Sequence, residues 1–441
     1  MSTTSSGGTN GEATTVGNYF VSNYPPYSFW NAQAAEQAVA TLDHPPNMEG
    51  PFGLYLHIPF CRKRCRFCYF KVYTDNDSSE ITRYLEGVAK ELTLYSNKPA
   101  VCGRKPKFIY FGGGTPSYIS TQQLSRLVNA IQPLFPWDEA EEITFECEPG
   151  TITKHKLEIL RDIGVTRLSL GIENFDDEIL EVNGRAHGSR EIDRAYGFAR
   201  DTGFPQINID LIAGMVGETD SNWEKCVRKS IALQPDSITI YQMELPPNTV
   251  ISKEMRINGQ PAPVADWRTK RHWTGYAFAE FEKAGYTLTS GYTAVRDTAT
   301  ATFLYRDLLW SGADMLGIGV SSFGHLQGVH IQNEHHMQPY LEAVEDGEIP
   351  IRRALPTTAE ERMIREFILQ MKKGRVDKPY FQSKFGVELQ DRFGTALEEL
   401  RRRGQVEIDS DSITLTREGL LRVDQLLHRF FLPRHRAANA A

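Results

Sequence analysis

From about residue 52 the chain repeats one unit, in which a short β-rich run is followed by a turn and a longer amphipathic stretch. The candidate strands are Phe52 to Ile58, Lys107 to Phe111, Glu142 to Glu148, Arg167 to Glu173, Gln206 to Ile212, and Ser237 to Met243. Helical patterns lie between them at Ile81 to Ser96, Thr121 to Leu134, Lys154 to Ile163, Ser189 to Thr202, and Asn222 to Ala232. Alternation of strand and helix predicts an α/β fold with parallel strands and the helices outside.

The polarity of individual strands indicates how this sheet curves. Arg167, Ser169 and Glu173 share one face of their strand, and apolar residues occupy the other. Asn208 and Asp210 alternate with apolar residues in the next strand in the same way. A closed eight-stranded barrel fills its interior with bulky apolar side chains. A polar inner face therefore predicts an open, partial (β/α)6 barrel of the TIM type with a ligand inside.

Three cysteines, Cys61, Cys65 and Cys68, directly follow the first predicted strand with C-x3-C-x2-C spacing. Three thiolates can hold three irons of a [4Fe-4S] cluster and leave the fourth iron open to a cofactor or substrate. The alternatives are a zinc site, which normally takes four ligands from paired knuckles, and a disulfide. The other cysteines are scattered and are expected to be ordinary thiols: Cys102, Cys147 and Cys226.

Other suggestive residues also follow the strands. The glycine run from Gly112 to Gly114 comes after the second strand. The acidic candidates, at the ends of the third, fourth and fifth strands, are Glu146, Glu148, Glu173 and Asp210. In parallel α/β folds the working residues gather at the carboxyl ends of the strands. We therefore expect these residues and the cysteine loop to share one face.

Length and composition fit a large globular chain of more than one domain. The chain has 441 residues, with 40% hydrophobic and 24% charged residues and a formal net charge of -7. Its acidity argues against a nucleic-acid partner, and no apolar stretch reaches the roughly 20 residues that span a bilayer. Residues 1–17 are rich in Ser, Thr and Gly, lack the features of a signal peptide, and are expected to form a disordered tail. We expect a cytoplasmic protein.

The remaining domain boundaries follow from changes in pattern. We predict an N-terminal segment over residues 18–51, the barrel over 52–250, and a barrel extension that covers the substrate over 251–355. Residues 356–436 show three helices, a short β pair and a closing helix, an order typical of a winged-helix module. Such a module can bind DNA or pack against the barrel, and the acidic composition favours packing.

Several motifs together resemble the radical S-adenosylmethionine (SAM) family of oxygen-independent coproporphyrinogen III dehydrogenase (oxidase). The motifs are Tyr55-x-His-x-Pro-Phe-Cys with the cysteine loop, Gly112-Gly-Gly-Thr-Pro116, Glu146-x-Glu-Pro149, Arg167-x-Ser-x-Gly-Ile-Glu-x-Phe175, Asn208-x-Asp-Leu-Ile-x-Gly214, and Leu316-Gly-x-Gly319. The resemblance runs from about Asn18 to Phe431 and implies that Cys61, Cys65 and Cys68 hold the cluster. It also implies that SAM binds the open iron and is cleaved to a 5'-deoxyadenosyl radical that takes hydrogen from a C–H bond.

The resemblance assigns further residues to the cofactor. Gly112, Gly113 and Gly114, with Thr115, would bring backbone amides to SAM, with a simple tight turn as the alternative. Phe67 would shield the cluster, and Tyr55 would act near the cofactor or substrate as the candidate catalytic residue, although a core aromatic is the alternative for Tyr55. Four charged residues would bind SAM, and structural ion pairs inside the barrel are their alternative: Glu146, Glu173, Arg185 and Asp210.

The sequence also departs from relatives within this family. The dehydrogenase usually has another cysteine two residues after its third ligand, and this chain has Phe70 there. The haem chaperones share an aromatic at this place but carry a His-Asn pair that is missing before Trp310. The favoured function is hydrogen abstraction from a tetrapyrrole side chain, with an external reductant such as flavodoxin or ferredoxin. The alternatives are methyl or methylene transfer with two SAM molecules, the second at Leu316 to Phe323, and haem delivery.

Overall fold

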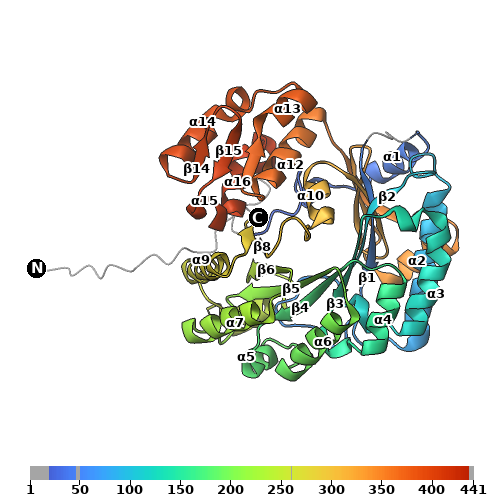
Figure 1. The fold of residues 1–441 in the computed structure, drawn as a ribbon. Coiled ribbons are helices and arrows are strands. Elements are labelled where there is room, and N and C mark those ends of the chain that lie inside the picture. Colours follow the sequence, from blue (N-terminus) through green and yellow to red (C-terminus); the bar gives the residue numbers. More distant parts are fainter. Residues whose placement is uncertain (1–18, 46–49, 260, 437–441) are drawn as a thin grey trace, which may run out of the picture.

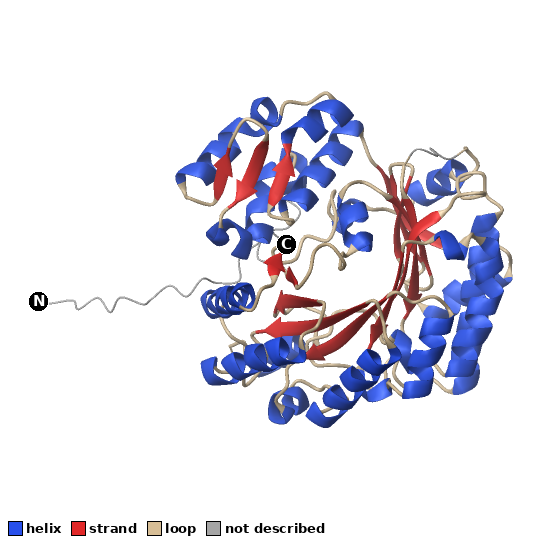
Figure 2. Ribbon diagram, in the orientation of Figure 1, coloured by secondary structure: helices blue, strands red, loops and turns tan. Residues whose placement is uncertain are grey.

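The computed structural model describes residues 19–45, 50–259 and 261–436, so the predicted tail at residues 1–17 lies outside the described residues. Its centre is a sheet of twelve strands in the order β12-β11-β10-β9-β1-β2-β3-β4-β5-β6-β8-β7. The sheet curves, and helices cover its outer face, as Figures 1 and 2 show. No helix among the described residues is long and apolar enough to cross a membrane.

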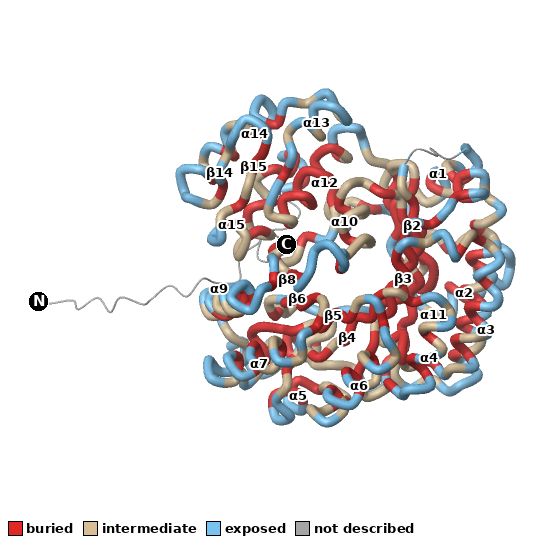
Figure 3. The backbone as a smooth tube through the Cα atoms, in the orientation of Figure 1, coloured by how far each residue is buried: buried red, intermediate tan, exposed pale blue. Residues whose placement is uncertain are grey.

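Six consecutive parallel strands form the middle of this sheet. They are β1 (Phe52–Ile58), β2 (Pro106–Gly113), β3 (Glu142–Cys147), β4 (Arg167–Glu173), β5 (Gln206–Ala213) and β6 (Ser237–Gln242). The crossover helices are α2 (Ser78–Ser96), α3 (Thr121–Ile131), α4 (Lys154–Asp162), α5 (Asp177–Val182), α6 (Ser189–Thr202) and α7 (Asp220–Leu233). The outward residues of the strands, such as Leu54, Leu168 and Ile209, are fully buried under these helices. Figure 3 shows this buried layer in red.

Residues after β6 extend the sheet at both edges. β7 (Thr287–Leu288) and β8 (Thr293–Val295) join the β6 edge, after α8 (Val250–Asn258) and α9 (Trp267–Lys283). β9 (Asp314–Ile318) joins β1 in parallel and continues into an antiparallel meander. The meander consists of β10 (Phe323–Leu326), β11 (Val329–Asn333) and β12 (Ile351–Pro356), with α10 (Leu304–Trp310) before β9 and α11 (Met337–Glu345) before β12. The run from Leu316 to Phe323 is therefore strand, turn and strand.

The C-terminal portion has its own core and a three-stranded sheet. Its helices are α12 (Ala359–Met371), α13 (Lys378–Phe385), α14 (Leu389–Arg402), α15 (Arg417–Leu421), α16 (Val423–Leu427) and α17 (Pro433–Arg436). Its strands are β13 (Arg375–Asp377), β14 (Val406–Ile408) and β15 (Ser412–Leu415), in the order β13-β15-β14. The closing helix of the sequence pattern is thus broken into short pieces, and β13 is an additional strand.

The N-terminal segment ties the two portions together. Tyr24 is fully buried in the C-terminal core and its hydroxyl accepts from the backbone N–H of Leu432 at 3.1 Å. Asn31 pairs with Ala354 of β12, and α1 (Ala34–Thr41) packs on the same strand. Arg417 of α15 also bonds to Glu282 of α9. The C-terminal portion therefore packs against the barrel.

A buried carboxylate fixes the turn after β9. Glu91 of α2 accepts from the backbone N–H of Gly319 at 2.8 Å, the hydroxyl of Tyr340 at 2.6 Å and the amide of Asn333. Burial raises the pKa of Glu91 to about 7. Since its folded-state pKa lies above the unfolded value, its contribution to stability is present at acid pH and lost as pH rises through 7.

We expect Glu91→Ala to lower the free energy of unfolding by about 3 kcal/mol at pH 5, because buried donors are left unpaired. The loss should shrink as pH is raised to 8. Urea unfolding at both pH values measures this, with Glu86→Ala on the exposed side of the same helix as the control. Equal losses in the two variants would contradict the role given to Glu91.

Candidate active site

The three cysteines of the loop after β1 come together beside the second strand. Cys61 is buried and its backbone N–H donates to the carbonyl of Tyr73 at 3.0 Å, which closes the loop back on β1. Thr115 Oγ1 donates to Cys61 Sγ at 3.4 Å. The thiols are near enough that Cys65 acts electrostatically on both Cys61 and Cys68. The fold thus gathers three sulfurs at the carboxyl ends of β1 and β2.

The chemistry of these thiols fits an iron-sulfur cluster. Burial raises the pKa of Cys61 to about 12 and that of Cys68 to about 11, so both need a bound cation to become thiolates. Within the described ranges, no three His, Cys, Asp or Glu side chains converge closely enough to hold a single metal ion. A single zinc draws thiolates to about 2.3 Å, whereas a cluster spreads its ligands over several irons. Three thiol ligands fit a cluster with one iron left open, whereas a structural zinc site normally takes four ligands.

The glycine turn after β2 locks the cysteine loop in place. Gly113 has φ of +117°, and a Cβ there would come within 2.6 Å of the His57 ring. A Cβ on Gly114 would come within 2.7 Å of the Pro59 backbone, and the Gly114 N–H donates to the carbonyl of Ile58 at 2.8 Å. Close packing therefore explains why positions 113 and 114 are glycine, since there is no room for a Cβ atom. The predicted amide contacts to SAM remain a prediction, as does the role of Gly112 and Thr115.

A hydrogen-bonded carboxylate network lies on the concave face next to this turn. Glu146 accepts from the Tyr110 hydroxyl at 2.7 Å and from the Gly113 N–H at 3.1 Å. Asp210 accepts from Ser169 Oγ at 2.7 Å and from Asn208 Nδ2 at 3.0 Å. Burial raises the pKa of Glu146 to about 7 and also raises that of Asp210. The inner wall is therefore polar, as its sequence alternation predicts.

Arg185 connects this wall to the cysteine loop. Its Nη1 donates to Cys65 Sγ at 3.3 Å, and its Nη2 donates to the carbonyl of Gly171 at 2.7 Å. Glu173 lies 3.5 Å from Nη1, with a positive φ of 67° and a pKa that burial raises to about 7. The fold thus brings both residues to the cluster loop, and they form the ion pair that was their alternative interpretation.

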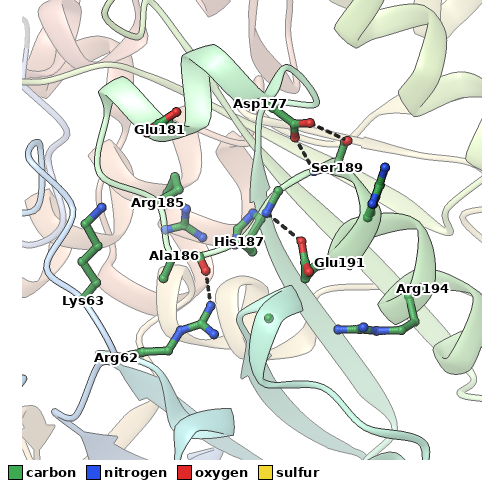
Figure 4. Close-up of a pocket in the computed structure, with 13 residues that line it drawn as sticks. Arg62, Lys63, Asp177, Glu181, Arg185, Ala186, His187, Ser189, Glu191 and Arg194 are labelled. Atoms are coloured by element: carbon green, nitrogen blue, oxygen red, sulfur yellow. Dashed lines mark hydrogen bonds between the residues drawn. The ribbon is translucent and has the colours of Figure 1, made fainter.

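Arg185 also forms part of a surface pocket of about 570 Å³ beside the cluster loop. Figure 4 shows Arg62 and Lys63 on one side of this pocket and Arg194 on another. Glu148, another of the acidic candidates at the strand ends, contacts the pocket residues His187 at 2.7 Å and Arg62 at 3.5 Å. Glu148 is therefore engaged in structural pairs away from the Glu146 network.

The two aromatic candidates lie in different places, Tyr55 in the middle of β1 and Phe67 in the cysteine loop. Tyr55 stacks on Tyr110 with ring centroids 5.8 Å apart, and its hydroxyl lies 3.2 Å from His57 Nδ1. Burial lowers the pKa of His57 to about 4, so this histidine is neutral. Phe67 packs on an apolar cluster at the ends of β5 and β6 that includes Met243. Tyr55 therefore faces the concave side, and Phe67 covers one edge of the cysteine loop.

Sequence reasoning missed several inner-wall residues. Tyr110 and Tyr305 have ring centroids 4.4 Å apart and form an aromatic side of the concave face. Tyr110 lies two residues before Gly112 on β2, so both face the same side of the sheet. This alternation could have identified Tyr110 as an inner-wall residue. Tyr305 carried no signal, because α10 reaches the barrel from a distant part of the chain.

The turn between β9 and β10, the predicted place of a second SAM, is occupied by contacts within the protein. The N–H groups of Gly319 and Val320 donate to Glu91 and to the Tyr84 hydroxyl. A Cβ on Gly317 would come within 2.1 Å of the Phe323 carbonyl oxygen. These contacts account for the glycines by sheet packing, so the second SAM stays a prediction.

Comparison with known proteins places this geometry in a family. A model of the radical SAM superfamily matches residues 55–229, and a model of the HemN C-terminal domain matches residues 357–422. The heme chaperone HemW of Bacillus subtilis is 27% identical over 390 residues, 85% of this chain and 98% of that protein. An oxygen-independent coproporphyrinogen III oxidase of Helicobacter pylori is 29% identical over 399 residues, 86% of each chain.

A solved structure gives the same architecture. Coproporphyrinogen III oxidase (HemN) from Escherichia coli, described as a radical SAM enzyme, matches with a TM-score of 0.81 and 24% identity over 93% of this chain and 96% of that chain. The predicted α/β barrel with a C-terminal domain is confirmed. The radical SAM family uses a [4Fe-4S] cluster and SAM, and the predicted cofactors are confirmed at that level. Residues 55–229 therefore form a radical SAM domain and residues 357–422 a HemN C-terminal domain, and the oxygen-independent coproporphyrinogen III oxidases and the heme chaperone HemW are relatives of this chain.

Proposed function

We propose that this protein is a radical SAM oxidoreductase that acts on a tetrapyrrole, by oxidative decarboxylation of coproporphyrinogen III propionates. The observation that carries the proposal is the cysteine loop, which the Arg185 guanidinium joins to a concave wall of buried carboxylates. When bound, the cluster and SAM supply an adenosyl radical that abstracts hydrogen. The protein itself binds, orients and excludes water.

The inner-wall residues fit the binding of a cationic cofactor. SAM carries a sulfonium and an ammonium group, and both favour carboxylate neighbours. Glu146, Glu173 and Asp210 would supply that charge, and Arg185 would take the cofactor carboxylate. Tyr55 would stand between cofactor and substrate. These carboxylates position groups and do not act as general acids or bases.

The experiment is an anaerobic incubation of reconstituted protein with SAM, a reductant and coproporphyrinogen III. We expect 5'-deoxyadenosine and a product that has lost carbon dioxide, detected by mass spectrometry. A product that gains carbon would point to methyl or methylene transfer instead. Absence of 5'-deoxyadenosine with a fully loaded cluster would contradict enzymatic function.

Haem delivery is a second candidate, because HemW aligns over 98% of its length and the third cluster cysteine is followed by two exposed aromatics, Tyr69 and Phe70. Trp310 is only 6% exposed and packs edge-on against Tyr292, so it is not placed to hold haem. Haem titration of the purified protein, beside a Tyr69→Ala/Phe70→Ala variant, tests this candidate. Stoichiometric binding that needs both aromatics, without SAM cleavage, would favour the chaperone.

The reductant should approach at the pocket in Figure 4, where lysine and arginine side chains outnumber the acidic ones. Lys63 and Arg190 line this pocket and are exposed, and Arg185 links the pocket to Cys65. Flavodoxins and ferredoxins present acidic surfaces, and opposite charge speeds encounter.

We expect a Lys63→Glu/Arg190→Glu variant to be reduced by flavodoxin hydroquinone about tenfold more slowly at low salt, because repulsion replaces attraction. Stopped-flow bleaching of the cluster measures this rate. Reduction by a small neutral reductant, photoexcited 5-deazariboflavin, should not change, and Arg402→Glu on the exposed face of α14 is the control. Unchanged flavodoxin rates would remove this surface as the docking site.

A further inference from the structure

Arg167, the first residue of β4, is a buried cation whose hydrogen-bonding capacity is not used. Its residue is 1% exposed, and its Nε and Nη1 groups are buried without an acceptor anywhere in the described part of the chain. The guanidinium carbon lies 4.0 Å from the centre of the Phe303 ring. A buried charge without hydrogen-bond partners destabilises a fold, so the unused donors of Arg167 indicate a partner from outside the chain.

The neighbouring carboxylates accept no hydrogen bond from the Nε and Nη1 groups of Arg167. Three of them act electrostatically with Arg167, and they are Glu142, Glu146 and Asp210. Each has its own donors. Glu142 accepts from the N–H groups of Leu304 and Tyr305, at 2.8 and 3.2 Å. The other two accept from Tyr110, Gly113, Ser169 and Asn208, as described above. The carboxylates are thus satisfied, while the Arg167 Nε and Nη1 groups donate to none of them.

Other buried arginines of the chain are paired. Arg104 lies 2.6 Å from Asp314, and Arg306, which also sits over Phe303, donates to Asp307 at 2.9 Å. Arg185 donates to Cys65 and Gly171. Arg167 differs from these three because no neighbour accepts a hydrogen bond from its Nε or Nη1 groups, which are therefore available to a bound molecule. Arg306 is therefore a matched reference for burial and ring contact.

The surroundings of Arg167 define what that partner looks like. The rings of Tyr55, Tyr110, Tyr305 and Phe303 form one side, with successive centroids 5.8, 4.4 and 5.6 Å apart. Tyr241 of β6, which interacts electrostatically with Arg167, keeps 41% of its surface exposed, so solvent reaches this concave face. Aromatic side chains pack against other aromatic rings, including single pyrroles, and a guanidinium binds a carboxylate through two parallel hydrogen bonds.

We propose that Arg167 is a subsite for a carboxylate substituent of a substrate built from aromatic rings, with one such ring against Tyr110 and Tyr305. The inference rests on the proposed function for its tetrapyrrole substrate, where the anchored group is a propionate. The carboxylate bound by Arg167 is an anchoring group and not the reacting one. It lies at the opposite end of β4 from Glu173 and the cysteine loop. The subsite therefore selects substrates by their acid groups and sets their depth along the strands.

Fluorescence titration of the holoprotein tests the subsite without turnover. The probes are coproporphyrin III with its tetramethyl ester, and 1-pyrenebutyrate with 1-pyrenebutanol, so that each acid has a neutral analogue. We expect Arg167→Gln to weaken binding of both acids about 10- to 100-fold, the range for hydrogen bonds between charged groups. Binding of the ester and the alcohol should change less than about threefold. Arg306→Gln should leave all four affinities near wild type.

Each outcome decides the matter. Unchanged acid binding in folded Arg167→Gln, or equal losses for acids and neutral analogues, overturns the subsite, as does failure of both acids to bind wild-type protein. If pyrenebutyrate binding depends on Arg167 and neither coproporphyrin III nor coproporphyrinogen III, added anaerobically as a competitor, binds, the tetrapyrrole proposal fails and the subsite stands. If Arg167→Gln does not fold, Arg167→Lys takes its place. Lysine keeps the charge but loses the paired geometry, so acid binding should weaken by about threefold to tenfold.

Discussion

Replacing any one of Cys61, Cys65 or Cys68 with alanine is expected to abolish a stable [4Fe-4S] cluster and, with it, cleavage of SAM. Each thiol is one of only three that the loop offers, so no neighbouring sulfur can replace it. Changes to outer-shell partners of a metal site cost about 10- to 100-fold, and loss of a direct ligand should cost more. Iron and sulfide analysis, with the visible absorption of anaerobically reconstituted protein, measures the effect.

Cys102→Ala is the matched control, because Cys102 is a free and exposed thiol. It should reconstitute to the wild-type iron content. Retention of a full cluster in all three loop variants would refute the ligand assignment. Loss of iron in Cys102→Ala as well would show that reconstitution depends on total thiol content and not on the loop.

Glu146→Gln is expected to weaken SAM binding by about tenfold or more at pH 8, since it removes a charge beside a cationic cofactor. Burial raises the pKa of Glu146 to about 7, so its carboxylate is ionised above that pH and protonated below it. Wild-type affinity for SAM should therefore rise between pH 6 and pH 8. The variant should show a flatter profile, because one carboxylate fewer then titrates near the cofactor.

Isothermal titration of the reconstituted protein measures both effects. Glu142→Gln is the control, because Glu142 lies on the same face of β3 but accepts from the backbone of α10. It should lower stability and leave SAM affinity near wild type. Equal SAM affinity and an equal pH profile in wild type and Glu146→Gln would exclude Glu146 from the cofactor site.

The barrel could be predicted from sequence because each strand and helix is marked by a pattern within its own segment. Leu168, Leu170 and Ile172 alternate with polar residues, and the same period-2 pattern marks the other inner strands. The added edge strands could not be predicted, because β7 and β13 have two and three residues and their pairing depends on distant partners. The broken closing helix also escaped prediction, since the turns between its pieces depend on contacts with α9 and the C-terminal core.

The site residues that belong to a sequence motif or follow a strand could be predicted. Those whose contacts depend on tertiary packing could not. The cysteine spacing identifies the cluster loop, and strand ends identify Glu146, Glu173 and Asp210 as neighbours. The pairing of Glu148 with His187 depends on the loop before α6, which sequence periodicity does not place. The unused hydrogen bonds of Arg167 are likewise a property of the assembled interior, since they depend on which donors reach Glu142 and Asp210.

Electron paramagnetic resonance of the reduced, reconstituted protein, recorded with and without SAM, tests most directly whether three thiolates leave one iron open. We expect a [4Fe-4S] signal whose shape changes when SAM binds, followed by 5'-deoxyadenosine in the same sample. A signal whose shape does not change with SAM, or a protein that takes up zinc in place of the cluster, would contradict the claim that one iron is open to SAM.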